Sequence, residues 1–324
     1  MSKQILTLLM GFSCLSVNAQ IVRIATSPSA IASQVPGYNE VSAVTTKSYQ
    51  YTPSPAYTPP TPVDDDSTTE DSKIYPYADN IPVNIGISDG NITSTSVGKV
   101  WTLRISISNA LNIGFAFNQF ALSSSAEMFI FNETRTVLDS GIKYSHFSNP
   151  SQVAIFPIKG NSAIIYIVEK NNYGSLLSSI SIQNLEAGYQ EIDDVGDVSN
   201  TGSATLRTTS VNCNPHMLCQ SHRMQSARSV ARFASNGFQG TGTLINSEGN
   251  NGRAFFLTAF HVLDVNRNFL NEPAGNGILD PDEIAALASA RFQFQFWRTS
   301  CNGNTNNNGI QFTGAVLRAA CTRR

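Results

Sequence analysis

Hydrophobic residues alternate with polar ones through the middle of this chain, from Tyr75 to about Ile192. Successive side chains of a β-strand point to opposite faces of a sheet, so a period of two predicts strands with one buried face. Turn signals such as Asp89-Gly90 and Lys159-Gly160 separate the runs. The pattern predicts a β-sandwich of two packed antiparallel sheets over residues 75–192. The alternating runs are Trp101, Leu103, Ile105 and Ile107; Leu111, Ile113, Phe115 and Phe117; Val153 and Ile155; and Ile164 to Val168.

The alternating segment contains no cluster of titratable residues that would mark a catalytic site. His146, Glu127 and Glu169 each stand without an obvious partner in the sequence. A lone polar residue on a strand is usually solvated. We therefore expect the sandwich to carry no active site of its own.

The first 19 residues have the features of a signal peptide. Lys3 supplies positive charge, Ile5 to Leu15 form an apolar core, and Val17-Asn18-Ala19 provide a small-residue cleavage signal. The apolar run is too short to span a bilayer, and no later run is long enough. The sequence therefore predicts a soluble, secreted or periplasmic protein with no membrane span. A buried N-terminal strand is the alternative interpretation of the same residues.

Charged residues are sparse and nearly balanced in sign. They make up 14% of the chain, and the formal net charge is −2. A protein that binds nucleic acid needs a basic surface to neutralise phosphates, so this composition argues against a nucleic-acid partner.

Two segments have the composition of linkers. Residues 20–74 are rich in Ser, Thr and Pro, and residues 193–210 are rich in Gly, Ser, Thr and Asp. Such segments bury too little apolar surface to order themselves. We expect residues 20–74 to be a linker or an extended pro-segment, and residues 193–210 to be a linker suited to proteolytic maturation. The triplet Asp64-Asp65-Asp66 fits a solvated charge run better than a calcium site.

Two apolar strands near the C-terminus flank a polar turn and deliver a histidine. The first strand is Gly240-Thr241-Gly242-Thr243-Leu244-Ile245, and the second is Phe255-Phe256-Leu257-Thr258-Ala259-Phe260-His261. A β-barrel hydrolase presents its general base in this way, at the end of a buried strand. The pattern resembles the trypsin-like serine endopeptidases, and among them the bacterial lysyl-endopeptidase-type branch. The resemblance covers roughly Cys213 to Leu317.

This resemblance implies an all-β protein with an N-terminal β-sandwich pro-domain, residues 75–192, followed by an incomplete trypsin-like β-barrel, residues 211–324. Precursors of the family carry a β-rich propeptide at the same place, which assists folding or keeps the protease inactive. His261 matches the general base of the Ser/His/Asp triad. The implied substrate is a protein or peptide.

The rest of the triad is missing from these residues. In the family, an aspartate and a serine follow the histidine, the serine within Gly-Asp-Ser-Gly, whereas the residues after His261 contain Ser289 and Ser300 but no such stretch. We interpret the chain as a secreted serine endopeptidase precursor, a zymogen truncated before the catalytic Asp and Ser and inactive as given. The alternative is a non-catalytic secreted β-sandwich protein for binding or adhesion, with a vestigial protease segment.

The cysteines after the signal peptide are Cys213, Cys219, Cys301 and Cys321. An exported protein meets conditions that permit disulfides. The resemblance implies a disulfide between Cys219 and Cys301 and leaves Cys213 without its family partner. Zinc is an alternative, because Cys213, His216, Cys219 and His222 recur at every third position, but disulfides suit the compartment better.

A possible calcium loop follows the histidine. Asp264, Asn266 and Asn268 have the spacing that opens such a loop, and Gly277 to Glu283 offer a turn and closing carboxylates. The register is broken, because Phe269 stands where the loop needs glycine. The alternative is a solvated loop that leads into a short helix from Pro281 to Ala290. No cofactor other than this calcium ion is expected.

Three phenylalanines near the C-terminus form the last predicted strand. Phe292, Phe294 and Phe296 alternate with Gln293 and Gln295. This alternation predicts a half-buried strand whose aromatic side packs in the core.

Overall fold

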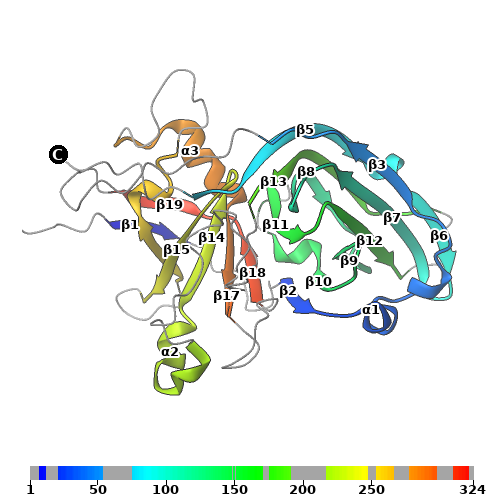
Figure 1. Cartoon of the computed structure of the whole chain (residues 1–324), viewed down its shortest axis with the longest axis horizontal. Helices are drawn as coiled ribbons and strands as arrows, with labels where there is room; N and C mark the ends of the chain where they lie inside the picture. The colour runs from blue at the N-terminus through cyan, green and yellow to red at the C-terminus, as the bar shows by residue number, and fades with distance from the viewer. Residues whose placement is uncertain are drawn as a thin grey trace, which may run out of the picture.

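The computed structural model describes residues 7–11, 21–53, 75–147, 149, 151–170, 175–190, 217–246, 253–265, 277–297 and 309–320. They form two β-rich units that lie side by side (Figure 1). We call residues 21–190 the sandwich and residues 217–320 the C-terminal unit. The all-β fold class predicted from the sequence is confirmed, with short helical segments between the strands.

The sandwich is built from two sheets. One sheet has the strand order β11-β8-β13-β5, and it faces the part of a larger sheet that has the order β10-β9-β12-β7-β3. The strands are β2 (Ile21–Ala25), β3 (Thr45–Tyr49), β5 (Ala78–Gly86), β6 (Asn91–Thr95), β7 (Gly98–Ile107), β8 (Asn112–Ala121), β9 (Ala126–Asn132), β10 (Val137–Ile142), β11 (Val153–Lys159), β12 (Ser162–Glu169) and β13 (Ser179–Gly188). The helical segments are α1 (Pro28–Gln34), η1 (Tyr38–Glu40), η3 (Ile87–Asp89) and η4 (Tyr144–His146).

The alternating residues form the core between these sheets. The four apolar residues predicted on one face of β7 are all buried, and their partners across the core come from β8, β11 and β13. Val100 and Thr102 on the other face are buried as well. Trp101 lies at one end of this core and donates a hydrogen bond from Nε1 to the Ile87 carbonyl at 2.6 Å. A Cβ at Gly90 would lie 2.3 Å from the Trp101 ring, so the predicted turn needs glycine there. Leu111 departs from the pattern, since it precedes β8 and is 39% exposed.

Residues 21–53 are folded, contrary to the linker interpretation of this part of 20–74. Ser27 caps α1 by accepting a hydrogen bond from the Ala30 amide at 3.2 Å. Ile31 and Val35 are buried against the outer face of the larger sheet, beside Phe131. The segment is polar on average, so its composition did not indicate that these few apolar residues would pack on the sandwich. The remaining part of the predicted linker, residues 54–74, lies outside the described residues.

Two of the lone polar residues of the sandwich are buried rather than solvated. Glu169 is 0% exposed and accepts hydrogen bonds from the Leu177 amide at 2.8 Å and from the Ser178 amide at 2.9 Å. The carboxylate thereby holds the chain that leads into β13. His146 is half-buried, and burial lowers the pKa of its imidazole. The prediction that Glu169 is solvated was therefore wrong, and Nδ1 of His146 is buried without a hydrogen-bond partner in the described structure.

The C-terminal unit has its own core and continues the larger sheet. Its strand order is β19-β1-β16-β15-β14-β17-β18, and in the described residues this sheet does not close into a barrel. The strands are β14 (Val230–Ser235), β15 (Phe238–Ile245), β16 (Phe255–Ala259), β17 (Arg291–Phe294), β18 (Gly309–Thr313) and β19 (Val316–Ala320), joined by β1 (Thr7–Gly11) and β4 (Tyr75–Pro76). The helical segments are η5 (Met217–Cys219), η6 (Ser221–Arg223), α2 (Met224–Ala227), η7 (Phe260–Val262), α3 (Pro281–Ala286) and η8 (Leu287–Ser289).

Strand β1 belongs to the predicted signal peptide. It pairs with β16, where Thr7 is opposite Ala259, and with β19, where Leu8 is opposite Ala320. Removal of residues 1–19 would therefore take a strand out of this sheet. Cleavage of the signal peptide remains a prediction.

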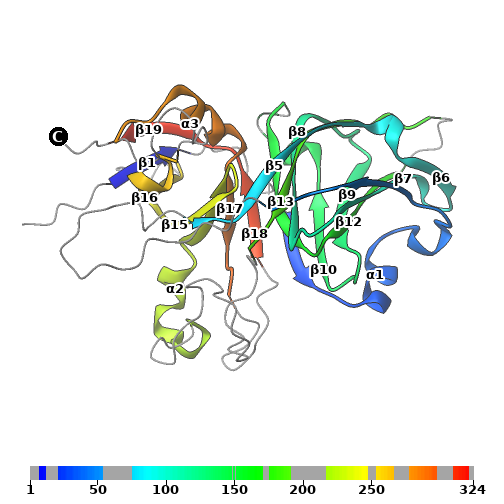
Figure 2. The same cartoon turned by 45° about the horizontal axis from the view of Figure 1, so that its top comes forward.

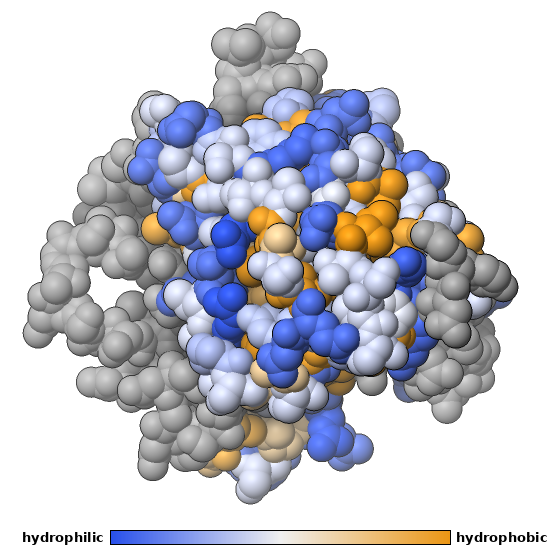
Figure 3. Space-filling view, turned by 90° about the vertical axis from the view of Figure 1, so that its right-hand side faces the viewer, coloured by the Kyte–Doolittle hydropathy of each residue, from blue (hydrophilic) through white to orange (hydrophobic). Residues whose placement is uncertain are grey.

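Strand β2 joins the two units. It pairs with β10 of the sandwich through Val22 and Ser140 and with β18 of the C-terminal unit through Val22 and Ile310. Figure 2 shows β17 and β18 at the boundary with the sandwich. The end of the sandwich remote from this boundary has mostly polar described side chains, with apolar ones in separate groups (Figure 3). None of the helices in the described ranges is long and apolar enough to cross a membrane.

Candidate functional site

The turn that carries His261 is fixed from inside the C-terminal unit. Strand β16 ends at Ala259, and Phe260 begins η7 with its side chain 4% exposed. The Phe260 carbonyl accepts hydrogen bonds from the Leu263 amide at 3.0 Å and the Asp264 amide at 3.1 Å. These bonds close the turn immediately after the strand, and His261 lies half-buried on it.

The two glycines of the first motif allow β15 to pack against this turn. A Cβ at Gly240 would lie 2.6 Å from Cγ1 of Val262, and a Cβ at Gly242 would lie 2.4 Å from the Leu257 carbonyl oxygen. Both distances are shorter than any ordinary contact, so side chains at these positions would push η7 and β16 away from β15. The Gly-Thr-Gly spacing thus sets the position of His261.

Strands β15 and β16 are paired in a fixed register beside the histidine. Gly242 is opposite Thr258, and Leu244 is opposite Phe256. The Thr258 hydroxyl donates to the Thr241 carbonyl at 2.8 Å, which adds a side-chain bond to the ladder. The ring of Phe256 packs on that of Phe292 with centroids 4.8 Å apart. The histidine therefore stands at the end of a strand that is paired with β15 and buried on the face of Phe256 and Thr258.

The acidic residues after His261 have structural partners. Asp264 is 3% exposed, and its Oδ2 accepts a hydrogen bond from the Gly277 amide at 2.8 Å. Asn266 and Asn268 lie outside the described residues, so the calcium site at Asp264, Asn266 and Asn268 remains a prediction. Within the described part of the chain, no group of three or more His, Cys, Asp or Glu side chains is placed to hold a metal ion.

Glu283 takes a role that the sequence analysis missed. The predicted short helix is present as α3 and η8, and α3 begins with a capping box in which Glu283 accepts a hydrogen bond from the Asp280 amide at 2.8 Å. Glu283 is 7% exposed, and its Oε1 has no hydrogen-bond partner. Burial raises the pKa of Glu283 from 4.5 to about 7, and the negative charge of Asp264 adds to the rise.

This pKa shift has a definite sign for stability. An unfolded chain ionises Glu283 near pH 4.5, whereas the folded chain holds the proton until about pH 7. The contribution of Glu283 to folding is therefore most favourable below pH 4.5 and becomes steadily less favourable as the pH rises to 7. The sequence signal for this role is the capping-box spacing, with Asp280 at the N-cap and Glu283 three residues later.

Cys219 is in a disulfide bond. Cys14, Cys213, Cys301 and Cys321 all lie outside the described residues, so the pairing of Cys219 with Cys301 remains a prediction. The same holds for the zinc alternative, because Cys213 and His216 are outside the described ranges too. His222, the fourth residue of that alternative, is exposed on η6.

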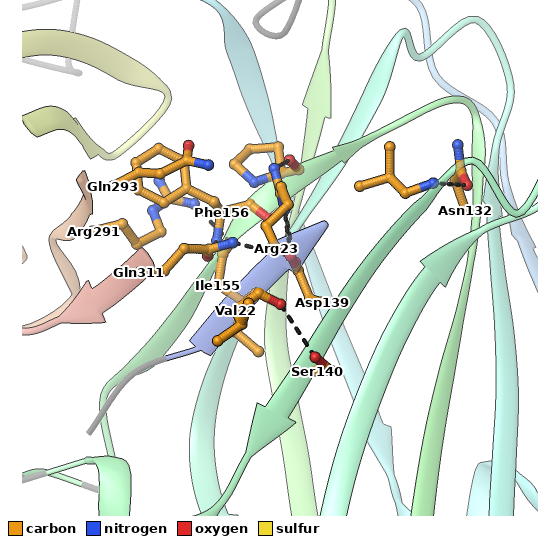
Figure 4. A network of polar contacts seen from close by, with 12 residues as sticks. Val22, Arg23, Asn132, Asp139, Ser140, Ile155, Phe156, Arg291, Gln293 and Gln311 are labelled. Carbon is orange, nitrogen blue, oxygen red and sulfur yellow. Dashed lines mark hydrogen bonds and ion pairs between the residues drawn. The ribbon is translucent and has the colours of Figure 1, made fainter. Parts of the chain in front are cut away.

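Strand β17 is buried on both faces, whereas the alternation of Phe292, Phe294 and Phe296 predicted a half-buried strand. Phe292 and Phe294 pack in the core of the C-terminal unit, but Arg291 is 1% exposed and Gln293 is 0% exposed. Phe296 follows the strand, is half-buried and lies under the guanidinium of Arg232, 3.9 Å from the ring centroid, so its predicted place in the core was wrong. The side of the strand that carries Arg291 and Gln293 faces the sandwich (Figure 4). Sequence reasoning missed this because the partner of Arg291, Glu186, is 105 positions away.

Comparison with protein families identifies one matching domain. Residues 207–323 match the model of the lysyl endopeptidase C-terminal domain. Searches among curated proteins and among solved structures gave no match. The matched range contains strands β14 to β19 and His261. This part of the chain is therefore similar to the lysyl endopeptidase C-terminal domain, which agrees with the resemblance found in the motifs.

Proposed function

We propose that this chain is the precursor of a secreted serine endopeptidase, with the C-terminal unit as the protease part and the sandwich as its pro-domain. The observation that carries the proposal is the β15–β16 pair, which holds a half-buried histidine on the turn directly after a strand with one buried face. The match of residues 207–323 to a lysyl endopeptidase domain supports the same assignment. The features of residues 1–19 support export.

In this proposal His261 is the general base. It takes the proton of a serine hydroxyl as the oxygen attacks the scissile carbonyl, and it passes that proton to the leaving amine as the acyl-enzyme forms. A carboxylate fixes the imidazole tautomer. These 324 residues contain no Gly-Asp-Ser-Gly. We therefore propose that a polypeptide of these residues alone does not hydrolyse peptide bonds.

A chimera tests the role of His261. Residues 1–318 of this chain would be joined to the matching C-terminal half of a lysyl endopeptidase, which supplies the serine and the aspartate. We expect hydrolysis of a lysyl ester that is blocked by a serine-directed reagent. His261→Ala should lower kcat by at least about 10⁴-fold, since removal of a triad member has an effect of that order.

His222→Ala is the matched control, because His222 is exposed on η6 in the same unit. It should leave the activity of the chimera unchanged. A folded chimera whose activity survives His261→Ala would contradict the proposal. Reading the coding sequence past the codon of Arg324 in all frames is a faster, complementary test, since it would reveal a Gly-Asp-Ser-Gly stretch if one is encoded there.

A further inference from the structure

The boundary between the sandwich and the C-terminal unit contains two buried arginine clusters. The first is centred on Arg23 of β2, which is 1% exposed. Its Nε and Nη2 donate to the two carboxylate oxygens of Asp139, each at 2.7 Å. Gln311 of β18 reaches the same carboxylate from the C-terminal unit, with Nε2 3.0 Å from Oδ1 (Figure 4). The Asp139 carboxylate of the sandwich thus accepts a hydrogen bond from a side-chain amide of the C-terminal unit.

The second cluster crosses the boundary directly. Arg291 of β17 donates two hydrogen bonds to the carboxylate of Glu186 on β13, from Nη1 and Nη2, both at 2.7 Å. The hydroxyl of Tyr77 donates to Glu186 at 2.7 Å and accepts from Arg291 at 3.0 Å. The side chain of Arg291 is 2% exposed and that of Glu186 is 6% exposed. A charged group of each unit therefore has its counter-charge on the other unit.

Backbone and aromatic contacts surround these clusters. Strand β2 pairs with β18, and the Tyr77 amide donates to the Gly237 carbonyl at 2.7 Å. The Thr313 hydroxyl donates to the Ala154 carbonyl at 2.7 Å. The guanidinium of Arg232 lies over the ring of Phe156, 4.8 Å from its centroid. The boundary is therefore packed and hydrogen-bonded, with the ion pairs inside it.

Separating the two units would be costly. Arg291 and Glu186 would each lose a bidentate partner with which they are buried, while Nε of Arg291 has no hydrogen-bond partner in the described structure. Replacing one member of such a buried pair while the units stay together is strongly unfavourable, because the remaining charge is buried without compensation. The loss of the β2–β18 ladder would also expose backbone groups of two strands.

The chain passes from the sandwich to the C-terminal unit through residues 191–216, which contain the predicted maturation linker 193–210. Hydrolysis of one peptide bond there consumes one water and leaves a new carboxylate and a new amine. Outside the predicted signal peptide, every cysteine lies at position 213 or later, so no disulfide can connect the resulting fragments. Contacts across the boundary are then all that holds them together.

We propose that the sandwich remains bound to the C-terminal unit after this cleavage, as a tight non-covalent partner held by the Arg23 and Arg291 clusters. The proposal names the docking surface of the pro-domain and rests on the proposed function for its biological meaning. In it, Asp139 and Glu186 are the specificity groups of the sandwich. Removal of the pro-domain then requires a step beyond linker cleavage, such as degradation of the sandwich.

The test uses the chain without residues 1–19, because β1 would otherwise tie the sandwich fragment to β16 and β19. The recognition sequence of a site-specific protease is inserted within residues 193–210. After complete cutting, size-exclusion chromatography at micromolar concentration should show both fragments in one peak at the mass of the uncut chain. Glu186→Gln leaves Arg291 uncompensated and should raise the dissociation constant of the fragments by about 100-fold or more. Lys47→Gln is the control, because it breaks an ion pair with Asp89 on β3 and η3, away from the boundary.

Each outcome decides the question. Separate elution of the cut, unsubstituted fragments would overturn the proposal, and equal affinity of the Glu186→Gln and control chains would overturn the role of the Arg291 cluster. If Glu186→Gln does not accumulate as folded chain, the double variant Glu186→Gln, Arg291→Gln removes both charges. The dissociation constant of its fragments is then measured in the same way. No hydrolytic activity is measured, so a failure of the chimera assay alone would overturn the protease assignment and leave this interface standing.

Discussion

Gly242→Ala should destabilise the C-terminal unit, because β15 has no room for a side chain at that position. The added Cβ would lie 2.4 Å from the Leu257 carbonyl oxygen and 2.4 Å from Cε1 of Phe256. One obstacle is backbone in the paired strand β16, which cannot rotate away as a side chain could. Strands β15 and β16 would have to separate by about 1 Å to restore an ordinary contact.

The expected magnitude follows from two opposing effects. Overpacking of this kind costs about 1–3 kcal/mol. Alanine in place of glycine restricts the unfolded chain and returns about 0.4–1 kcal/mol. The net loss in the free energy of unfolding should be about 1–2 kcal/mol, which corresponds to a fall of about 5–9 °C in the midpoint of thermal unfolding of a unit this size.

Urea unfolding, followed by tryptophan fluorescence, measures this loss, with Gly86→Ala as the matched control. Gly86 is also in a strand, but a Cβ there would meet only the Ile180 carbonyl at 3.8 Å, an ordinary contact. The control should unfold within about 0.5 kcal/mol of the unsubstituted chain or be slightly more stable. Equal stability of the Gly242→Ala and Gly86→Ala chains would refute the close approach of β15 to β16.

Three further predictions concern pH, disulfides and activity. Glu283→Gln should stabilise the protein at pH 8 by about 1 kcal/mol after solvent screening is allowed for. It should have little effect at pH 5, because the pKa of Glu283 in the folded chain is raised to about 7. Urea unfolding at both pH values checks this, and a larger gain in stability at pH 5 would contradict it. Cys219 should be found linked to Cys301 by peptide mapping of the unreduced exported protein; free thiols on both would rule the pair out. The 324-residue polypeptide should show no hydrolysis of casein that a serine-directed reagent blocks, and clear, reagent-sensitive hydrolysis would mean that another hydroxyl serves His261.

The sheets and the position of the histidine were predictable because their causes are local. A period of two identified the core residues of β7, including Trp101, since strand geometry alone decides which side chains share a face. The helix that begins at Pro281 follows from the conformational preference of a single residue. The same applies to the strand that ends before His261.

The sequence analysis failed where burial depends on distant parts of the chain. Ile31 and Val35 stand in a segment of polar composition, and they are ordered only because the sandwich offers a surface for them. Glu169 was expected to be solvated, but a loop that returns to its carboxylate with two backbone amides buries it. Neither outcome is visible in composition or periodicity.

The sequence by itself therefore determined the strand content, the core face of β7 and the place of His261 at the end of a strand, since these depend on interactions between residues close in the chain. Only the tertiary structure decided which faces lie at the boundary between the units. Arg23 pairs with Asp139, which is 116 residues away in the sequence, and Arg291 pairs with Glu186, which is 105 residues away. A buried charge is stable only beside its counter-charge, and that neighbour exists only when the strands that carry both have been brought together.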